Sequence, residues 1–330
     1  MTEIKTDINQ IQINSLNHIT GQTQAVELLK LSIDAYFQSR SKNCNGSTFG
    51  PVLLVGPSGT GKTLIAKAVH QELANLKLLE TNGEMLNHQA ELVSMLIDAD
   101  ENTTIFIDEA QAINTKNQHI LLTAISERKI YIPSSNTKSK KFTIPLANFV
   151  LILASTHEYQ LQDALRNRMR IYCRFDYYNL NDLFLITKQR SDALCWNYDS
   201  DEVILEVSRR AKQTPRLALN RNLQMAYNVS ISNDRDTITI SDVYEAFQLL
   251  QIDSLGLDSI ERAYLQELSK HETMKLNVLA SKLGLPRQTV VNVLEPYLLR
   301  IELIEKQGSD RLITEKGKNH ILNSEFMARS

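Results

Sequence analysis

The chain has 330 residues, which is too long for one ordinary compact domain and suits two or three. Hydrophobic residues make up 42% of it and charged residues 22%, a balance that excludes a disordered or fibrous protein. Lysine and arginine number 36 against 38 aspartate and glutamate residues, so the formal net charge is −2. This charge excludes a basic coat for nucleic acid over the whole chain, but it allows a local basic patch.

Cysteine usage and the amino-terminal residues predict a cytoplasmic location. Cys44, Cys173 and Cys195 form an odd set without metal-ligand spacing, so we expect neither a disulfide framework nor a zinc site. Residues 1–14 are polar and contain no apolar signal core. No stretch approaches the roughly 18 uninterrupted apolar residues of a membrane span, so we expect no membrane contact.

The first expected elements are an arm and a long helix. Residues 1–15 predict a loose arm. A helix is expected over residues 22–39, because its apolar residues are spaced by three and four, namely Val26, Leu29, Ile33 and Phe37. The polar, turn-rich residues 41–51 predict a loop after this helix.

A strand, a glycine-rich loop and a helix follow over residues 52–55, 56–63 and up to 73. Two further apolar runs, at 104–107 and 149–153, are short and apolar on both faces. Strands buried in a parallel sheet have this pattern, and helical stretches alternate with them. The sequence therefore predicts an α/β domain with a P-loop type of parallel sheet.

Beyond residue 178 the pattern is helical up to residue 252, and Thr214-Pro215-Arg216 is typical of a helix start. After a further change near residue 255, three helical patterns precede a strand pair, over 259–270, 276–283, 287–300, 303–306 and 311–314. Three helices and a hairpin are the plan of a winged helix. We expect an α/β domain, an all-helical lid and a winged helix, over 1–178, 179–254 and 255–330.

The strongest chemical signal is Gly56-x4-Gly61-Lys62-Thr63, a phosphate-binding pattern between a strand and a helix. Glycines let backbone N–H groups surround a polyphosphate, and the helix directs its positive end at the same anion. Lys62 would reach the β- and γ-phosphates of ATP, and the Thr63 hydroxyl would bind Mg²⁺. The candidate nucleotide contacts are Gly56, Pro57, Ser58, Gly59, Thr60, Gly61, Lys62, Thr63 and Leu64.

Two strand ends supply candidates for the reaction itself. The run over 104–107 ends in Asp108 and Glu109, at the carboxyl edge where ligands of parallel sheets bind. Asp108 would hold Mg²⁺, and Glu109 would polarise the attacking water. Thr156 follows the run over 149–153, and its hydroxyl would contact the γ-phosphate or that water.

Two arginines are candidates for stabilising charge on the γ-phosphoryl group. Arg168 lies at an expected helix end, and an arginine supplied by a neighbouring subunit can neutralise charge that develops there. The alternative is that Arg166, Arg168 and Arg170 form an ordinary basic face. Arg216 would meet the γ-phosphate within its own subunit, unless it is simply an exposed residue at a helix start.

The expected winged helix offers a surface for DNA. Arg287 opens the candidate recognition helix, and Lys306 and Arg311 flank the candidate wing, where they would contact phosphates. A winged helix also serves as a protein contact, so both alternatives stay open. In the first domain, the tip of an expected hairpin would touch DNA or a partner, or be solvated, at Lys138, Lys140 and Lys141.

The motifs and their order resemble the AAA+ ATPases and, among them, the RuvB family of Holliday-junction branch-migration motors. The resemblance extends over about residues 16–320 and does not rest on the phosphate loop alone. The other segments that carry it are 19–22, 105–109, 154–156, 165–168, 213–216, 255–258 and 294–298. Two departures stand out, since Gln111 replaces the family's histidine after the acidic strand and the wing has lost most of its basic run.

The resemblance implies a hexameric ring of three-domain subunits, with nucleotide between the large domain and the lid. It implies that Arg168, rather than Arg166, is the arginine finger and that Tyr178 lies near the nucleotide. It also implies DNA contacts at Lys306 and Arg311. Duplex or branched DNA would be the substrate, and a junction-binding protein would recruit the ring.

We therefore expect an ATP-hydrolysing motor that translocates or branch-migrates duplex or junction DNA. The alternative is an ATP-switched adaptor or loader that assembles on DNA and recruits another protein, because both would use the same pocket. A protein remodeller is a third possibility.

Overall fold

The computed structural model describes residues 6–11, 13–42, 48–132 and 142–327. Contacts divide the chain into two compact units. The first contains residues 9–186 and 214–216, and the second contains residues 1–8, 187–213 and 217–330. The helical region and the winged helix thus share a unit, and the three-domain division stays a prediction.

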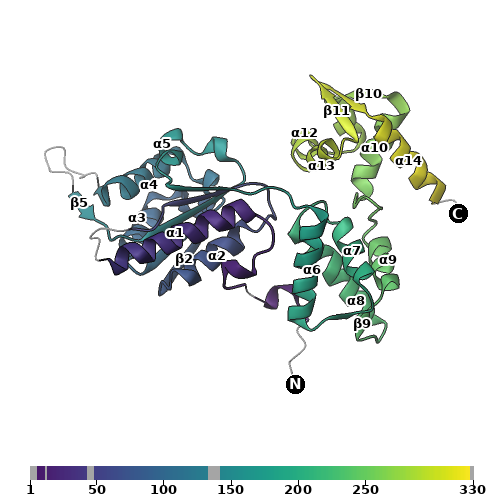
Figure 1. Ribbon diagram of the computed structural model, residues 1–330. Coiled ribbons are helices and arrows are strands. Elements are labelled where there is room, and N and C mark those ends of the chain that lie inside the picture. The colour runs from purple at the N-terminus through teal and green to yellow at the C-terminus, as the bar shows by residue number, and fades with distance from the viewer. Residues whose placement is uncertain (1–5, 12, 43–47, 133–141, 328–330) are drawn as a thin grey trace. The chain divides into compact units, whose positions relative to one another are not determined.

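The first unit is built on a five-stranded parallel sheet with the order β2-β3-β6-β1-β7 (Figure 1). Its strands are β1 (Val52–Val55), β2 (Lys77–Asn82), β3 (Thr103–Asp108), β6 (Val150–Ser155) and β7 (Ile171–Arg174). The predicted parallel sheet is confirmed. The sequence does not predict β2 and β7, because these edge strands are partly exposed and lack an apolar run on both faces.

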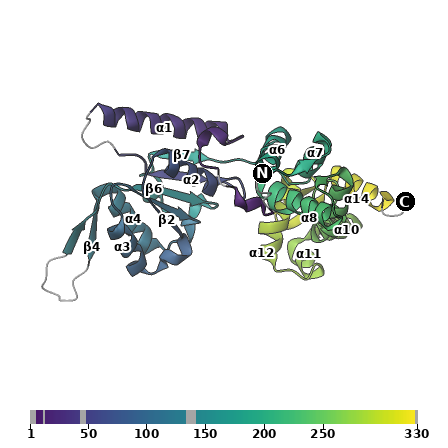
Figure 2. The same cartoon turned by 90° about the horizontal axis from the view of Figure 1, so that it is seen from below.

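Side chains that alternate along the strands place a helical layer on each face of the sheet (Figures 1 and 2). Leu54 belongs to the hydrophobic cluster formed with α1 (Thr23–Ser41) and α2 (Lys62–Glu72). Its neighbour Leu53 belongs to the cluster formed with α3 (Gln89–Asp98) and α4 (Thr115–Glu127). The central strands are buried on both faces, so they form a well-packed platform for whatever follows their carboxyl ends.

Short elements complete this unit. They are the 3₁₀ turns Leu16–His18, Gly83–Asn87, Ala110–Ala112 and Glu158–Gln160, and the single-turn helix α5 (Asp163–Arg166). The expected hairpin is present as β4 (Lys129–Ile132) paired antiparallel with β5 (Phe142–Pro145). Its predicted lysine tip, Lys138, Lys140 and Lys141, lies outside the described residues.

The predicted helical region contains α6 (Leu180–Leu194), α7 (Asp201–Arg209), a π-helical turn (Leu217–Leu223), α8 (Gln224–Ser232) and α9 (Ile240–Leu249). A short pairing joins β8 (Asn197–Tyr198) to β9 (Thr237–Ile238). The expectation of a loose amino-terminal arm is wrong at Ile8, which lies in the 3₁₀ turn Ile8–Gln10 and is 2% exposed. Its N–H donates to Gln224 over 2.9 Å, and its carbonyl accepts from Arg190 over 2.8 Å.

The winged helix has the predicted three helices and hairpin (Figure 1). Its buried apolar side chains form a hydrophobic cluster of their own. Its elements are α10 (Ser259–His271), β10 (Thr273–Lys275), α11 (Leu276–Lys282), α12 (Arg287–Thr289), a π-helical turn (Val290–Leu294), α13 (Glu295–Arg300), β11 (Ile304–Gln307), β12 (Asp310–Ile313) and α14 (Glu315–Met327). The sequence does not predict two of these elements, β10 and α14. Strand β10 completes a sheet of order β10-β12-β11. Within the described parts of the chain, no helix is long and apolar enough to cross a membrane.

Candidate active site

Three neighbouring strand ends bring the candidate residues together at the carboxyl edge of the sheet. β6 lies between β3 and β1, and the last residue of β6, Ser155, pairs in register with Val55 at the end of β1. The glycine-rich loop follows β1, Asp108 ends β3, and Thr156 follows β6. The loop, the acidic pair and the hydroxyl are therefore assembled at one edge, where parallel sheets bind their ligands.

The glycine-rich loop has a backbone that favours glycine at three positions. Gly56, Gly59 and Gly61 have φ values of 153°, 79° and 97°. A Cβ atom at Gly56 would lie 2.4 Å from the carbonyl oxygen of Phe175, so this position is closed to larger residues. Gly61 is the N-cap of α2, so the unpaired N–H groups of the first helical turn, at Lys62 and beyond, open toward the loop.

Lys62 is 6% exposed, and its ammonium donates to the carbonyl oxygens of Gly56 and Pro57 over 2.7 and 2.8 Å. Burial lowers the pKa of Lys62, while the charges of Glu109 and Asp108 partly oppose this effect. No carboxylate pairs with this ammonium among the described residues. The site therefore contains a buried cation that an anion such as a phosphate would compensate.

Thr63 and Asp108 form a pair that fits Mg²⁺. The Thr63 hydroxyl donates to Asp108 Oδ2 over 2.8 Å. A hydroxyl and a carboxylate are hard oxygen ligands, and Mg²⁺ takes few of these from protein and the rest from phosphates and water. Leu64 follows in the same turn of α2 and is half-buried, next to the residues that would hold the nucleotide.

Glu109 and Thr156 are in direct contact. The Thr156 hydroxyl donates to Glu109 Oε2 over 2.7 Å. Glu109 has a φ of 47°, a left-handed conformation that costs energy in a residue other than glycine. Gln111 also donates to Glu109. The sequence pattern does not predict this contact of Gln111, because the side chain meets Glu109 only when the turn after β3 has folded.

A buried tyrosine supports the phosphate loop. The Tyr178 hydroxyl donates to the Thr60 carbonyl over 3.0 Å, and burial raises the pKa of Tyr178 to about 12, so it stays a neutral donor. A Cβ atom at Gly21 would lie 2.6 Å from the Tyr178 ring. The Gln22 side chain bonds the carbonyl and the N–H of Asp176 over 2.7 and 3.2 Å. The early glycine–glutamine segment thus fixes the chain that carries Tyr178, a role that the sequence pattern alone does not reveal.

Arg216 reaches the phosphate loop within the same compact unit. Its Nη1 donates to the Ser58 hydroxyl over 2.9 Å, and both side chains are exposed. A Cβ atom at Gly59 would lie 3.0 Å from Arg216 Cβ, so the backbone of the loop and this arginine are close. This position fits the predicted contact between Arg216 and a γ-phosphate.

The three arginines near α5 differ in their partners. Arg166 is bonded to Asp163, and Arg170 donates to the Thr48 hydroxyl over 2.7 Å. Arg168 is exposed, and its guanidinium has no partner among the described residues. Of the three, Arg168 is therefore the arginine that is available to another molecule, which fits its predicted role better than an ordinary basic face does.

The predicted DNA contacts in the winged helix have different surroundings. Arg287 is exposed at the start of α12. Lys306 pairs with Glu295 over 2.8 Å. Arg311 is 5% exposed, and its Nε and Nη2 donate to the two carboxylate oxygens of Glu295 over 2.8 and 3.1 Å. The prediction that Arg311 contacts DNA does not fit this position, because a buried bidentate ion pair already satisfies its charge.

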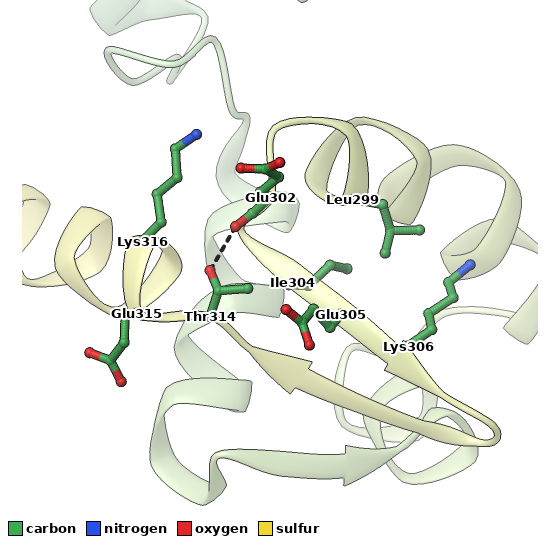
Figure 3. A pocket seen from close by; sticks show the side chains of 8 residues that line it. All are labelled: Leu299, Glu302, Ile304, Glu305, Lys306, Thr314, Glu315 and Lys316. Carbon is green, nitrogen blue, oxygen red and sulfur yellow. Dashed lines mark hydrogen bonds between the residues drawn. The ribbon is translucent and has the colours of Figure 1, made fainter.

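A cavity of about 670 Å³ lies beside the wing (Figure 3). Its charged lining consists of the side chains of Glu302, Glu305, Lys306, Glu315 and Lys316. Carboxylates outnumber ammonium groups in this lining, so the cavity does not suit a polyphosphate. The edge of the parallel sheet remains the candidate site for a nucleotide.

Comparison with known proteins agrees with this geometry. The family model of the Holliday junction DNA helicase RuvB P-loop domain matches residues 11–175, and that of the RuvB C-terminal winged helix domain matches residues 254–322. The chain belongs to the RuvB family. The RuvB subunit of the Holliday junction branch migration complex from Ligilactobacillus salivarius is 31% identical, over 89% of this chain and 88% of that protein.

Another RuvB subunit, from Granulibacter bethesdensis, is 30% identical over 93% of this chain and 84% of its own length. Among solved structures, a mutant of Thermotoga maritima RuvB matches with a TM-score of 0.80 and 27% identity, over 94% of this chain and 99% of that chain. RuvB membership confirms the predicted family and fold. It makes the chain an ATPase of a family of ATP-driven DNA motors, and nothing in these comparisons favours the adaptor.

Proposed function

We propose that this chain binds ATP with Mg²⁺ at the carboxyl edge of its sheet and hydrolyses it at the subunit interfaces of a hexameric ring. The ring would translocate or branch-migrate duplex or junction DNA. One observation carries the proposal. An uncompensated buried ammonium at Lys62 lies beside the Thr63–Asp108 and Thr156–Glu109 pairs, which is a set of groups suited to a triphosphate, a metal ion and a water.

The reaction requires an in-line attack of water on the γ-phosphoryl group, so positioning and charge stabilisation dominate the mechanism. Backbone N–H groups of the loop and the Lys62 ammonium would hold the phosphates. Mg²⁺, held by Thr63 and Asp108, would neutralise charge on the phosphate oxygens. Glu109 would polarise the water, and Thr156 would contact the γ-phosphate or that water.

Two arginines would connect this reaction to movement. Arg168, exposed and unpaired among the described residues, would stabilise the γ-phosphoryl charge in the site of a neighbouring subunit. Arg216 would bind the γ-phosphate and release it after hydrolysis, which would shift the helical region that follows it in the chain. The winged helix would follow that movement while bound to DNA.

DNA contact would begin at Arg287, whose charge is exposed, with a weaker contribution from Lys306. The matched relatives are named as subunits of a branch migration complex, which supports a further, junction-binding protein partner for this chain. The cytoplasm is the proposed location, and the free thiols of Cys173 and Cys195 support it.

The test is the ATPase rate of the purified chain without DNA, with duplex DNA and with four-way DNA. We expect hydrolysis that requires Mg²⁺ and is stimulated by DNA. Displacement of a third strand from triplex DNA then separates a motor from an adaptor, because only translocation displaces the strand. ATP-dependent DNA binding without displacement would contradict the motor.

A further inference from the structure

Gln111 connects the glutamate that we assign to water activation with the strand end that carries Thr156. Its side chain comes from the 3₁₀ turn Ala110–Ala112, which packs into the core through the fully buried Ala110. Ser155 Oγ donates to Gln111 Oε1 over 2.7 Å. Gln111 Nε2 donates to Glu109 Oε2 and, over 3.0 Å, to Thr156 Oγ1. Both ends of the amide are therefore engaged.

The orientation of this amide follows from its partners. A carboxylate accepts hydrogen bonds and does not donate them, so the amide nitrogen faces Glu109 and the amide oxygen faces Ser155. Ser155 is fully buried at the end of β6, and its hydroxyl oxygen accepts the N–H of His157 over 3.1 Å. The group that anchors Gln111 is thus part of the sheet, in register with the end of β1 that precedes the phosphate loop.

The backbone of Glu109 is fixed by packing, because a Cβ atom at Gly83 would lie only 2.3 Å from the Glu109 carbonyl oxygen. Its carboxylate, in contrast, is positioned by hydrogen bonds from two side chains. Gln111 and Thr156 both donate to Oε2, and Oε1 has no hydrogen-bond partner among the described residues. One carboxylate oxygen is therefore positioned, and the other is available to a water molecule.

We propose that Gln111 is a positioning residue that holds Glu109 Oε2 and the Thr156 hydroxyl as one unit, so that Oε1 faces the attacking water. This inference rests on the proposed role of Glu109 in ATP hydrolysis. An amide carries no charge and does not titrate near neutral pH, so Gln111 fixes the geometry of the carboxylate without adding charge beside it. Gln111 acts through Glu109 and is not itself a catalytic residue.

The test is Gln111→Met, which keeps the length of the side chain and removes its donor and acceptor. The matched control is Gln118→Met, since Gln118 is a buried glutamine of α4 that bonds the Ile113 carbonyl and the Gln162 N–H, each over 2.8 Å. Gln111→Met should lower kcat about 10- to 100-fold while the affinity for a non-hydrolysable ATP analogue stays unchanged. Its Tm should fall as well, because the fully buried Ser155 hydroxyl loses its acceptor. Gln118→Met should lower Tm and leave kcat close to that of the wild type.

A second comparison uses the Glu109→Gln background in single-turnover experiments. Adding Gln111→Met to Glu109→Gln should not lower the single-turnover hydrolysis rate further, because the carboxylate that Gln111 positions is already absent. A wild-type kcat in Gln111→Met, or an equal fold loss in both backgrounds, would overturn this role. A wild-type chain that binds ATP and fails to hydrolyse it would instead overturn the proposed function, so the two failures are distinguishable.

Discussion

Lys62 and Arg311 are buried cations in different regions of the molecule, with exposures of 6% and 5%. The Lys62 ammonium donates to backbone carbonyls, and burial lowers its pKa. Arg311 bonds both carboxylate oxygens of Glu295, and these hydrogen bonds raise its pKa. The phosphate loop thus keeps a buried charge uncompensated, whereas the wing neutralises its own.

A basic residue in a family motif therefore predicts a ligand contact only where the fold leaves its charge unpaired. At the sheet edge, a phosphate would supply the missing negative charge. In the winged helix, Glu295 already supplies it, and Lys306 shares the same carboxylate. Arg311 therefore stabilises the wing, and the exposed Arg287 is a better candidate for DNA contact than Lys306.

The arginines near α5 also differ in whether their charge is paired, since Arg168 is unpaired among the described residues and Arg166 is bonded to Asp163. Arg168→Ala should lower kcat about 10³-fold, because the unpaired arginine would stabilise charge in a neighbouring site. Arg166→Ala should lower kcat much less, because Arg166 is already bonded to Asp163. Mixing Arg168→Ala with Lys62→Ala subunits should restore part of the ATPase rate if sites are shared. Failure to restore activity at any mixing ratio would contradict a shared site.

Glu295→Gln removes the negative charge that pairs with Arg311 and Lys306. Leaving Arg311 buried without a full counter-charge should cost about 3–5 kcal/mol in the free energy of unfolding. Urea unfolding followed by the fluorescence of Trp196, the one tryptophan of the chain, measures this loss in the same compact unit. Glu305→Gln on the exposed side of β11 is the control and should change the free energy by about 0.5 kcal/mol or less.

The pH dependence of stability follows from the same pair. Burial alone would raise the pKa of Glu295, but the hydrogen bonds and charges of Arg311 and Lys306 outweigh it, and the pKa is lowered from 4.5. The stabilisation is therefore complete above pH 4.5 and is lost as pH falls below it. The wild type should lose its advantage over Glu295→Gln in this acidic range. An advantage that persists at the lowest pH would contradict the ion pair.

The unpaired Lys62 ammonium predicts weaker ATP binding at alkaline pH. Because burial lowers the pKa of Lys62 below the usual 10.5, its ammonium loses a proton at a lower pH than an ordinary lysine. Above that lowered pKa, binding must restore the proton, so affinity should fall by up to about tenfold for each pH unit. Titration of a fluorescent ATP analogue at increasing pH measures this fall. An affinity that stays constant up to pH 10.5 would contradict the assignment.

The smallest expected effect separates Arg287 from Lys306. Arg287→Ala should weaken duplex binding uniformly across sequences and reduce the slope of log affinity against log salt by about 1. Lys306→Met should change that slope less, because Glu295 already neutralises part of its charge. Binding titrations at several salt concentrations measure both slopes. A larger change for Lys306→Met would reverse the proposed ranking.

Local patterns predict the central strands, the phosphate loop and the winged helix, because apolar runs and glycine spacing are properties of adjacent residues. They do not predict β2 or β7, because edge strands carry a mixed pattern. The order of the strands brings Asp108, Thr156 and the phosphate loop together at one edge of the sheet. The sequence shows only that each of them follows an expected strand, and it does not give the order of those strands.

Other features depend on contacts between residues far apart in the chain. The Glu295–Arg311 pair joins α13 to β12. The sequence of the wing alone does not distinguish a buried arginine from an exposed one. Gln111 gains its role from Ser155 and Thr156, more than 40 residues later in the chain. Residue patterns identified which chemistry is available, and packing decides which side chains are free to perform it.

An equilibrium titration of ATP with Mg²⁺ onto the wild type and Lys62→Met tests whether the buried ammonium binds the nucleotide. We predict saturable binding to the wild type, and a loss of affinity of about 100-fold or more in the variant, because charge-assisted hydrogen bonds to phosphate are lost. A wild-type chain that binds no ATP, or equal affinities for the two proteins, would contradict the account.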